Sequence, residues 1–286
     1  MPSRNAKFGS FKSKGIISLM VLACSLLAGS VSEAVLFITP TRLVFEGRTR
    51  SATVTFLNQK SDTKTYRLFW REKDQNADGK FLNMEEGDDV PWSAQHMIRY
   101  SPRQVTVGPQ ESQLVRFALR KPKDLAEGEY RSHLVIEEQP PIKNEGDEQI
   151  GGDAIGIQIH MLYSYTMPIV VVNGDFKTKV AIRDFRTRPT NGPEWIAEAK
   201  LVNSGGTSAL GVIRLEWEET DGSSTVVGEG GSVSIYLPQK ERNFSLKYRR
   251  PDTPGRLRFA YYEDRHAKRI NVNLPSKKLI AEAYLK

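Results

Sequence analysis

Short runs of alternating apolar and polar residues, separated by turn residues, fill the chain from Val35 onward. Alternation places one class of side chain on each face of an extended strand, whereas a helix repeats its apolar positions every three or four residues. Almost no helical periodicity is present. In the first half, strands are predicted at LVFEG (43–47), SATVTFLN (51–58), TYRLFWRE (65–72), QLVRFALRK (113–121), EYRSHLVIE (129–137) and IGIQIHMLYSY (155–165). Short strands with Gly, Pro, Asn and Asp between them indicate an all-β sandwich.

A second set of alternating runs follows Pro168. Its predicted strands are VAIRDF (180–185), WIAEAKLVN (195–203), LGVIRLEWEE (210–219), GSVSIYL (231–237), FSLKYRR (244–250), RLRFAYYED (256–264) and RINVNL (269–274). The Gly-rich residues 228–231 are expected to form a hairpin turn rather than a phosphate-binding loop. The expected fold class is therefore all-β, with two immunoglobulin-like β-sandwich domains at 35–168 and 169–286. Because no Gly/Ser-rich linker separates them, they are expected to meet at a stiff angle, in a boomerang-like arrangement.

The first 34 residues have the composition of a secretory signal peptide. Four basic side chains lie between residues 4 and 14, and residues 16–28 form an apolar h-region. Ser32-Glu33-Ala34 places small residues at the positions that a signal peptidase reads. Cleavage after Ala34 would deliver the protein to the periplasm. A lipoprotein site that ends at Cys24 is the alternative.

Charge and cysteine content limit the class of the mature protein. Removal of residues 1–34 takes away four positive charges and one negative charge, so the formal net charge falls from +7 to +4. That mild excess is spread along the chain and does not indicate nucleic-acid binding. The only cysteine, Cys24, leaves with the signal peptide, so no disulfide is expected in spite of export.

The alternating run that ends at Met167 is unusually long. Every odd position from Ile155 to Met167 is apolar or aromatic, which makes a strand of 13 residues, whereas most strands have about five or six. The preceding residues, QPPIKNEGDEQIGG (139–152), are polar and acidic and are typical of a mobile loop. Spacing alone would allow the apolar face to line the protein's own core or to be covered by another protein.

Four stretches resemble the periplasmic pilus chaperones of the chaperone–usher pathway, the PapD-like family. They are ITPTRLVFEGRTRSATVTFLN (38–58), YSPRQVTVGPQESQLVRFALRK (100–121), EGEYRSHLVIEEQPP (127–141) and the long strand that ends in TMPIVVVNG (166–174). The YRSHL run is most similar to the archaic, spore-coat-like branch. The resemblance covers the first domain by sequence and the second only by architecture.

The resemblance implies a function in fimbrium biogenesis. A chaperone of this family stabilises pilus subunits by lending its long strand to their incomplete sandwich, and delivers them to an outer-membrane usher. The implied donor-strand residues here are Ile155, Ile157, Ile159, Met161 and Tyr163. An exposed apolar edge strand also invites self-pairing. The free protein is therefore expected to self-associate through this strand or to cover it with residues 139–152.

The resemblance also implies two basic residues that anchor the carboxylate of the subunit. Arg42 lies at the place of the first. The second is usually a lysine on the long strand, and this chain has Tyr163 there. Arg131 could take that role, because a planar guanidinium binds a carboxylate with two hydrogen bonds. Arg42 is expected to be partly exposed and to contribute little to stability.

Residues 74–85, DQNADGKFLNME, satisfy a calcium-loop pattern through Asp74, Asn76, Asp78 and Glu85. However, an EF-hand requires helices on both sides, and the flanking residues are strand-like before the loop and turn-like after it. An acidic hairpin with an Asp-Gly turn is therefore preferred. No metal or other cofactor is expected.

The remaining chemistry-bearing residues give no indication of an enzyme. His133 and His160 could be neighbours on adjacent strands, although isolated histidines on a sheet surface are the simpler interpretation. No nucleophile elbow or phosphate-binding loop is present. The leading hypothesis is a fibre-assembly chaperone. A fibre subunit is a weak alternative, and a secreted two-domain ligand-binding or adhesion module is the other.

Overall fold

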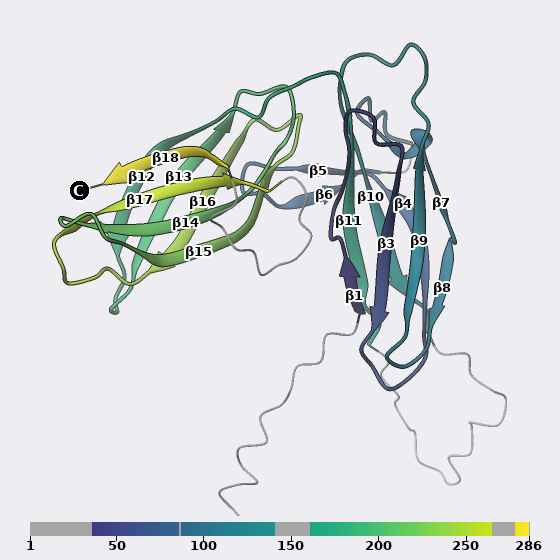
Figure 1. Cartoon of the computed structure of the whole chain (residues 1–286), viewed down its shortest axis with the longest axis horizontal. Coiled ribbons are helices and arrows are strands. Elements are labelled where there is room, and N and C mark those ends of the chain that lie inside the picture. Colours follow the sequence, from purple (N-terminus) through teal and green to yellow (C-terminus); the bar gives the residue numbers. More distant parts are fainter. Residues whose placement is uncertain (1–35, 86, 141–160, 265–277, 286) are drawn as a thin grey trace, which may run out of the picture. The chain divides into compact units, whose positions relative to one another are not determined.

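The computed structural model describes residues 36–85, 87–140, 161–264 and 278–285, and these residues are nearly all in β-strands (Figure 1). The helical structure that they contain is a single 3-10 turn, Gln95–Met97. The all-β class predicted from the alternating runs is confirmed. The signal peptide, its cleavage site and Cys24 lie outside the described residues.

The first group of strands forms two sheets. One sheet has the order β1-β3-β9-β7, with β1 at Leu36–Thr39, β3 at Ser51–Asn58, β9 at Ser112–Leu119 and β7 at Ile98–Ser101. The other has the order β2-β11-β10-β4-β8, with β2 at Leu43–Phe45, β11 at Ser164–Asn173, β10 at Gly128–Glu138, β4 at Lys64–Arg71 and β8 at Gln104–Val107. Neighbouring strands are antiparallel except for β2 and β11, which are parallel.

Alternation within each strand builds the first core. In β4, Tyr66 and Leu68 are buried, whereas Arg67 and Arg71 are exposed. The Tyr100 ring lies in the same core, and its hydroxyl donates a hydrogen bond of 2.9 Å to the Leu68 carbonyl. This bond satisfies the polar end of an otherwise apolar side chain, which is the usual condition for burying tyrosine.

The second group of strands also forms two sheets. The order β12-β13-β16 joins Val180–Pro189, Trp195–Asn203 and Glu241–Tyr248. The order β15-β14-β17-β18 joins Ser224–Ile235, Ala209–Glu219, Gly255–Glu263 and Leu279–Leu285. Phe259 is buried between them and makes edge contacts with Phe185 at 5.3 Å and Phe244 at 5.6 Å between ring centroids. The second sandwich therefore has a core of its own.

A short hairpin leaves the first sandwich after β4. Its strands are β5, Lys73–Gln75, and β6, Phe81–Asn83, and they pair only with each other. Gly79 between them has φ +78°, a backbone region that glycine enters without steric cost. The hairpin predicted for residues 74–85 is confirmed.

Several boundaries differ from the sequence prediction. Pro168 lies inside β11, which stays paired with β10 as far as Asn173, and the division into domains at 35–168 and 169–286 stays a prediction. Residues 228–231 are not a turn. They belong to β15, and the turn of that hairpin is at Gly222. A side chain at Gly230 would meet the Phe244 ring, so glycine permits close packing there.

Four strands, most of them short, escaped prediction. These are β1, β7, β8 and β18. The run 269–274, predicted to be a strand, lies outside the described residues. The boomerang-like arrangement of the two domains stays a prediction.

Candidate functional site

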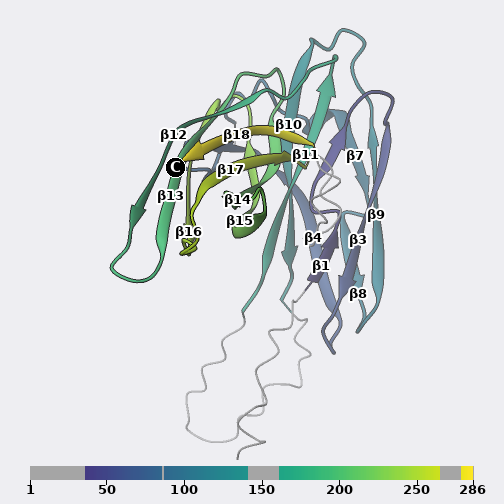
Figure 2. The same ribbon diagram turned by 60° about the vertical axis from the view of Figure 1, so that its left-hand side comes forward.

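The N-terminal half of β11 is an open sheet edge. Figures 1 and 2 show β11 beside β10, and the two strands pair over residues 164–173. On its other side, β11 pairs with β2 only at residues 169–171. Within the described part of the chain, no strand pairs with residues 164–168 on that side. Their backbone groups are therefore available to an incoming strand.

The alternation in β11 is used partly by the protein itself. Met167, Ile169 and Val171 are buried in the first core, and Tyr165 packs against it. For this part of the run, the apolar face lines the core of the chain. The residues predicted to face a partner, from Ile155 to Tyr163, precede β11.

The residues directly before β11 have exposed apolar side chains. Met161 is 72% exposed, Leu162 46% and Tyr163 41%. Backbone hydrogen bonding fixes Tyr163, since its carbonyl accepts from the N–H of Glu138 at 2.9 Å. Met161 and Tyr163 thus present apolar surface beside the open edge. The other predicted donor residues, Ile155, Ile157 and Ile159, lie outside the described residues.

Arg42 lies between β1 and β2, and it is buried. Its side chain is only 7% exposed, so the expectation of a partly exposed residue is wrong. One terminal nitrogen donates to the Asp264 carbonyl at 2.8 Å, and the other to the Ser232 hydroxyl at 3.2 Å. These two partners offset part of the cost of burying the charge, while the Nε–H of Arg42 has no partner among the described atoms.

Arg131 on β10 is buried more completely. It is 1% exposed and donates to the carbonyls of Leu237 at 3.1 Å and Lys73 at 2.8 Å. Its guanidinium carbon lies 4.6 Å from the centroid of the Tyr236 ring. Burial lowers the pKa of this guanidinium from its ordinary value, but arginine keeps its charge. Both predicted anchor residues therefore donate to backbone carbonyls of the second sandwich, Arg42 to that of Asp264 and Arg131 to that of Leu237.

Three of the four predicted calcium ligands accept hydrogen bonds through their side-chain oxygens. The Asn76 side-chain oxygen accepts from the N–H groups of Asp78 at 3.1 Å and Lys80 at 2.9 Å. Asp78 accepts from the Asn243 side chain at 3.0 Å, and Asp74 accepts from the Gln75 N–H at 2.7 Å. Glu85 donates its own N–H to Asp88 at 2.8 Å. Over the described ranges, no three His, Cys, Asp or Glu side chains are grouped as metal ligands would be.

The hairpin joins the two sandwiches. Gln75 is buried, and its side-chain oxygen accepts from the Tyr236 N–H at 2.9 Å. The Ala77 carbonyl accepts from the Asn243 N–H at 2.7 Å. The Phe81 ring lies 5.6 Å from that of Tyr236. Sequence reasoning missed these contact residues, and the one available signal was an aromatic residue, Phe81, in a polar turn region.

His133 is buried beside this junction, not on a sheet surface as expected. It is 1% exposed, and its ring makes an edge contact with Phe81 at 5.0 Å between centroids. Burial, and then the positive charges of Arg131 and Lys73, lower the pKa of the imidazole to about 3. Neither ring nitrogen has a hydrogen-bond partner among the described atoms. His133 is therefore neutral at ordinary pH, and its predicted neighbour His160 lies outside the described residues.

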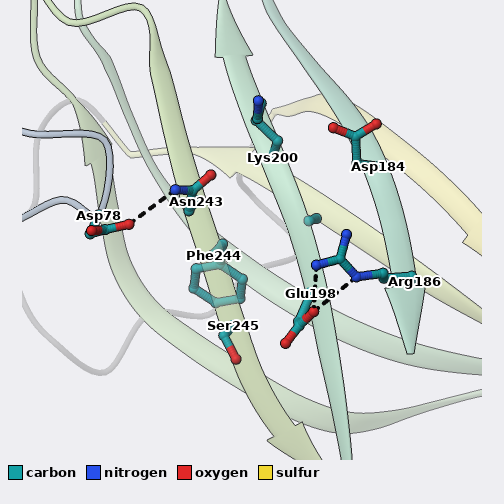
Figure 3. A pocket seen from close by; sticks show the side chains of 9 residues that line it. Asp78, Asp184, Arg186, Glu198, Lys200, Asn243, Phe244 and Ser245 are labelled. Atoms are coloured by element: carbon teal, nitrogen blue, oxygen red, sulfur yellow. Dashed lines mark hydrogen bonds and ion pairs between the residues drawn. The ribbon is translucent and has the colours of Figure 1, made fainter. Parts of the chain in front are cut away.

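One shallow pocket of about 440 Å³ lies on the outer face of β12, β13 and β16 (Figure 3). Its charged groups are largely paired: Arg186 with Glu198 at 2.8 Å, and Asp78 with Asn243 at 3.0 Å. Asp184, with φ +53°, lies at the bulge of β12. The pocket holds no arrangement of nucleophile and base that would support catalysis.

Comparison with known proteins gives structural neighbours only. No family model matches the chain, and no curated protein matches it. The structural neighbours include chaperones, among them a fimbriae chaperone, and complexes of chaperones with pilus proteins.

One neighbour is the CsuC–CsuE chaperone–tip adhesion subunit pre-assembly complex from archaic Csu pili of Acinetobacter baumannii. It is 15% identical, with a TM-score of 0.45, over 86% of this chain and 97% of that one. The E. coli chaperone DraB is 13% identical, with a TM-score of 0.44, over 88% and 95%. The Pseudomonas aeruginosa chaperone CupB2 is 15% identical, with a TM-score of 0.43, over 80% and 95%. Each of these TM-scores is below 0.5.

Within the described ranges, no helix has the length and apolar character that a membrane crossing requires.

Proposed function

We propose that this protein is a chaperone that binds and stabilises pilus or fimbrial subunits by donor-strand complementation. The observation that carries the proposal is the open edge of β11 at residues 164–168, next to the exposed side chains of Met161 and Tyr163. A soluble β-protein normally blocks such an edge with charge, proline or a covering element. An edge left open beside exposed apolar residues fits a partner that supplies the missing neighbour.

Strand addition explains why a long alternating strand is useful. Backbone hydrogen bonds would extend the sheet of β11 and β10 into the subunit, and alternate side chains would enter its groove. Ile155, Ile157, Ile159, Met161 and Tyr163 would be the inserted residues. Each fully buried aliphatic side chain stabilises such a complex by about 1.5–3 kcal/mol. The four aliphatic side chains together would outweigh the ordering of one peptide segment.

For the anchor of the subunit carboxylate, we favour Arg42 over Arg131. Arg42 donates one hydrogen bond to a neutral hydroxyl, that of Ser232. A carboxylate could take the place of this hydroxyl and accept a stronger, charge-assisted hydrogen bond. Arg131 is held by two carbonyls and an aromatic ring, and its release would disrupt the junction between the sandwiches.

The cellular part of the proposal follows from the sequence. Export through the predicted signal peptide would place the protein in the periplasm, where it would deliver subunits to an outer-membrane usher. An outer-membrane usher and small secreted β-rich subunits should therefore be encoded beside this gene. Their absence would favour the ligand-binding or adhesion alternative.

The direct test is the double variant Ile157→Thr, Ile159→Thr. Threonine keeps β-branching and strand propensity but removes the apolar fill. We expect near-normal thermal unfolding and loss of co-purification with a subunit encoded beside the gene. A matched control is Leu114→Thr, Val226→Thr, which changes two exposed apolar residues on other faces and should retain the subunit. A large fall in melting temperature with binding retained would show that the residues belong to the protein's own core.

A further inference from the structure

Three cations lie in a row on the outer face of β4 and β5. Tyr66 and Leu68 of β4 point into the first core, so the alternate residues Arg67, Phe69 and Arg71 lie on the opposite face. Lys73, at the start of β5, continues the same two-residue spacing. Arg67 and Arg71 are exposed, and Phe69 and Lys73 are half-buried. We call Arg67, Phe69, Arg71 and Lys73 the cation strip.

The three cations of the strip form no ion pair with another described residue. By contrast, most cations on the strands of the second sandwich do. Glu137 of β10 lies opposite Arg67 of β4, but no ion pair joins the two side chains. Arg71 also lowers the pKa of the Lys73 ammonium, secondary to burial. Like charges at this spacing repel one another, so the free protein bears an electrostatic cost that an anionic partner would relieve.

Phe69 holds the two guanidiniums in place. The guanidinium carbons of Arg67 and Arg71 each lie 5.7 Å from the centroid of its ring. Contacts of this kind contribute about 0.5–1 kcal/mol at exposed sites. They also reduce the side-chain entropy that the arginines would lose on binding, so the strip is partly preorganised for a ligand.

The spacing of the strip selects the shape of the ligand. Side chains on one face of a strand repeat about every 6.6 Å. Alternate side chains of an extended polypeptide repeat at the same distance. Of four such side chains in a row, the first, third and fourth would face Arg67, Arg71 and Lys73, and the second would face Phe69. The half-buried ring of Phe69 would suit an aliphatic side chain of the same segment.

We propose that the cation strip is a second binding surface, which takes an extended acidic polypeptide segment of a partner protein. It lies on β4 and β5, separated from β11 by β10 in the sheet order. The inference does not depend on strand pairing at β11, and it needs only the charges and geometry of these four residues.

The test is fluorescence anisotropy with a short labelled peptide of alternating glutamate and valine, at low ionic strength. The variant is Arg67→Gln, Arg71→Gln, Lys73→Gln. The control is Arg99→Gln, Arg116→Gln, Lys123→Gln, which removes the same charge from exposed positions of the same sandwich. We expect the strip variant to weaken binding at least about tenfold, and the control to stay within about threefold. Added salt should weaken binding to the wild type more than to the strip variant.

Three results would overturn the proposal. Equal peptide binding by the wild type and the strip variant would show that the strip is not the binding site. Equal losses of affinity in the strip variant and the control would show a general effect of charge. Strip-dependent binding of phosphatidylglycerol vesicles or single-stranded DNA, with no binding of the peptide, would assign another ligand class. If the triple variant unfolds, Arg71→Glu serves instead, because it changes one exposed residue. The Ile157→Thr, Ile159→Thr variant should bind the peptide normally, which separates this test from that of the proposed function.

Discussion

The guanidinium of Arg131 lies over the ring of Tyr236, with 4.6 Å between its central carbon and the ring centroid. Arg131 belongs to β10 of the first sandwich, and Tyr236 follows β15 of the second. Around this pair, the Arg131 nitrogens hold the carbonyls of Leu237 and Lys73, and Gln75 holds the Tyr236 N–H. One buried cation thus connects β10, the β5–β6 hairpin and the second sandwich.

Arg131→Met should therefore destabilise the protein. Methionine keeps an unbranched apolar stem and removes the guanidinium, so two buried carbonyls lose a charge-assisted hydrogen bond. We expect the free energy of unfolding to fall by about 2–4 kcal/mol, measured by urea titration. Arg99→Met, at an exposed position of β7, should change it by no more than about 0.5 kcal/mol. A small effect at Arg131 would show that the junction tolerates loss of its central cation.

Gln75→Leu tests the hairpin contact. The substitution leaves the Tyr236 N–H without its side-chain acceptor in a buried site, at a cost of about 1–3 kcal/mol. Hydrogen exchange at Tyr236 and Asn243 should accelerate, because the hairpin would separate from β16 more often. Gln104→Leu on the exposed face of β8 is the matched control. Unchanged exchange at Tyr236 would contradict the contact.

His133 should make stability depend on pH. Its folded-state pKa is lowered to about 3, so the unfolded chain binds a proton first as the pH falls. Its contribution is present above pH 6.5 and is lost on acidification, at about 1.4 kcal/mol per pH unit. Between neutral pH and pH 5, the loss should be about 2 kcal/mol. His133→Phe should remove that part of the slope, and His96→Phe, at an exposed position, should not.

Calcium should not bind at residues 74–85. The side-chain oxygens of Asn76 and Asp78 already accept hydrogen bonds in the turn and from Asn243. Titration calorimetry with millimolar calcium should give no heat that Asp74→Ala plus Asp78→Ala abolishes. Heat that depends on these two residues would restore the calcium-supported alternative function.

The exported protein should begin at Val35. Mass spectrometry of periplasmic material should find this N-terminus, because Ala34 and Ser32 are the small residues that the peptidase requires. A lipid-modified Cys24 would contradict both the cleavage site and the soluble periplasmic location.

The sequence by itself determined the β class and most of the longer strands. β3 and β13 match their predicted runs, 51–58 and 195–203, at both ends. Strand periodicity is local, since successive side chains of an extended backbone point to opposite faces whatever the rest of the chain does. The Asp-Gly turn at residues 78 and 79 was likewise readable, because only local backbone geometry decides it.

Tertiary structure alone decided which polar residues are buried. Arg42, Arg131 and His133 have sequence neighbours typical of surface residues, yet each contacts a residue more than 90 positions away in the second sandwich. The same holds for the open edge of β11, which exists because β2 reaches only residues 169–171. Burial and edge exposure are properties of distant contacts, and alternation along one strand carries no information about which strand will lie beside it.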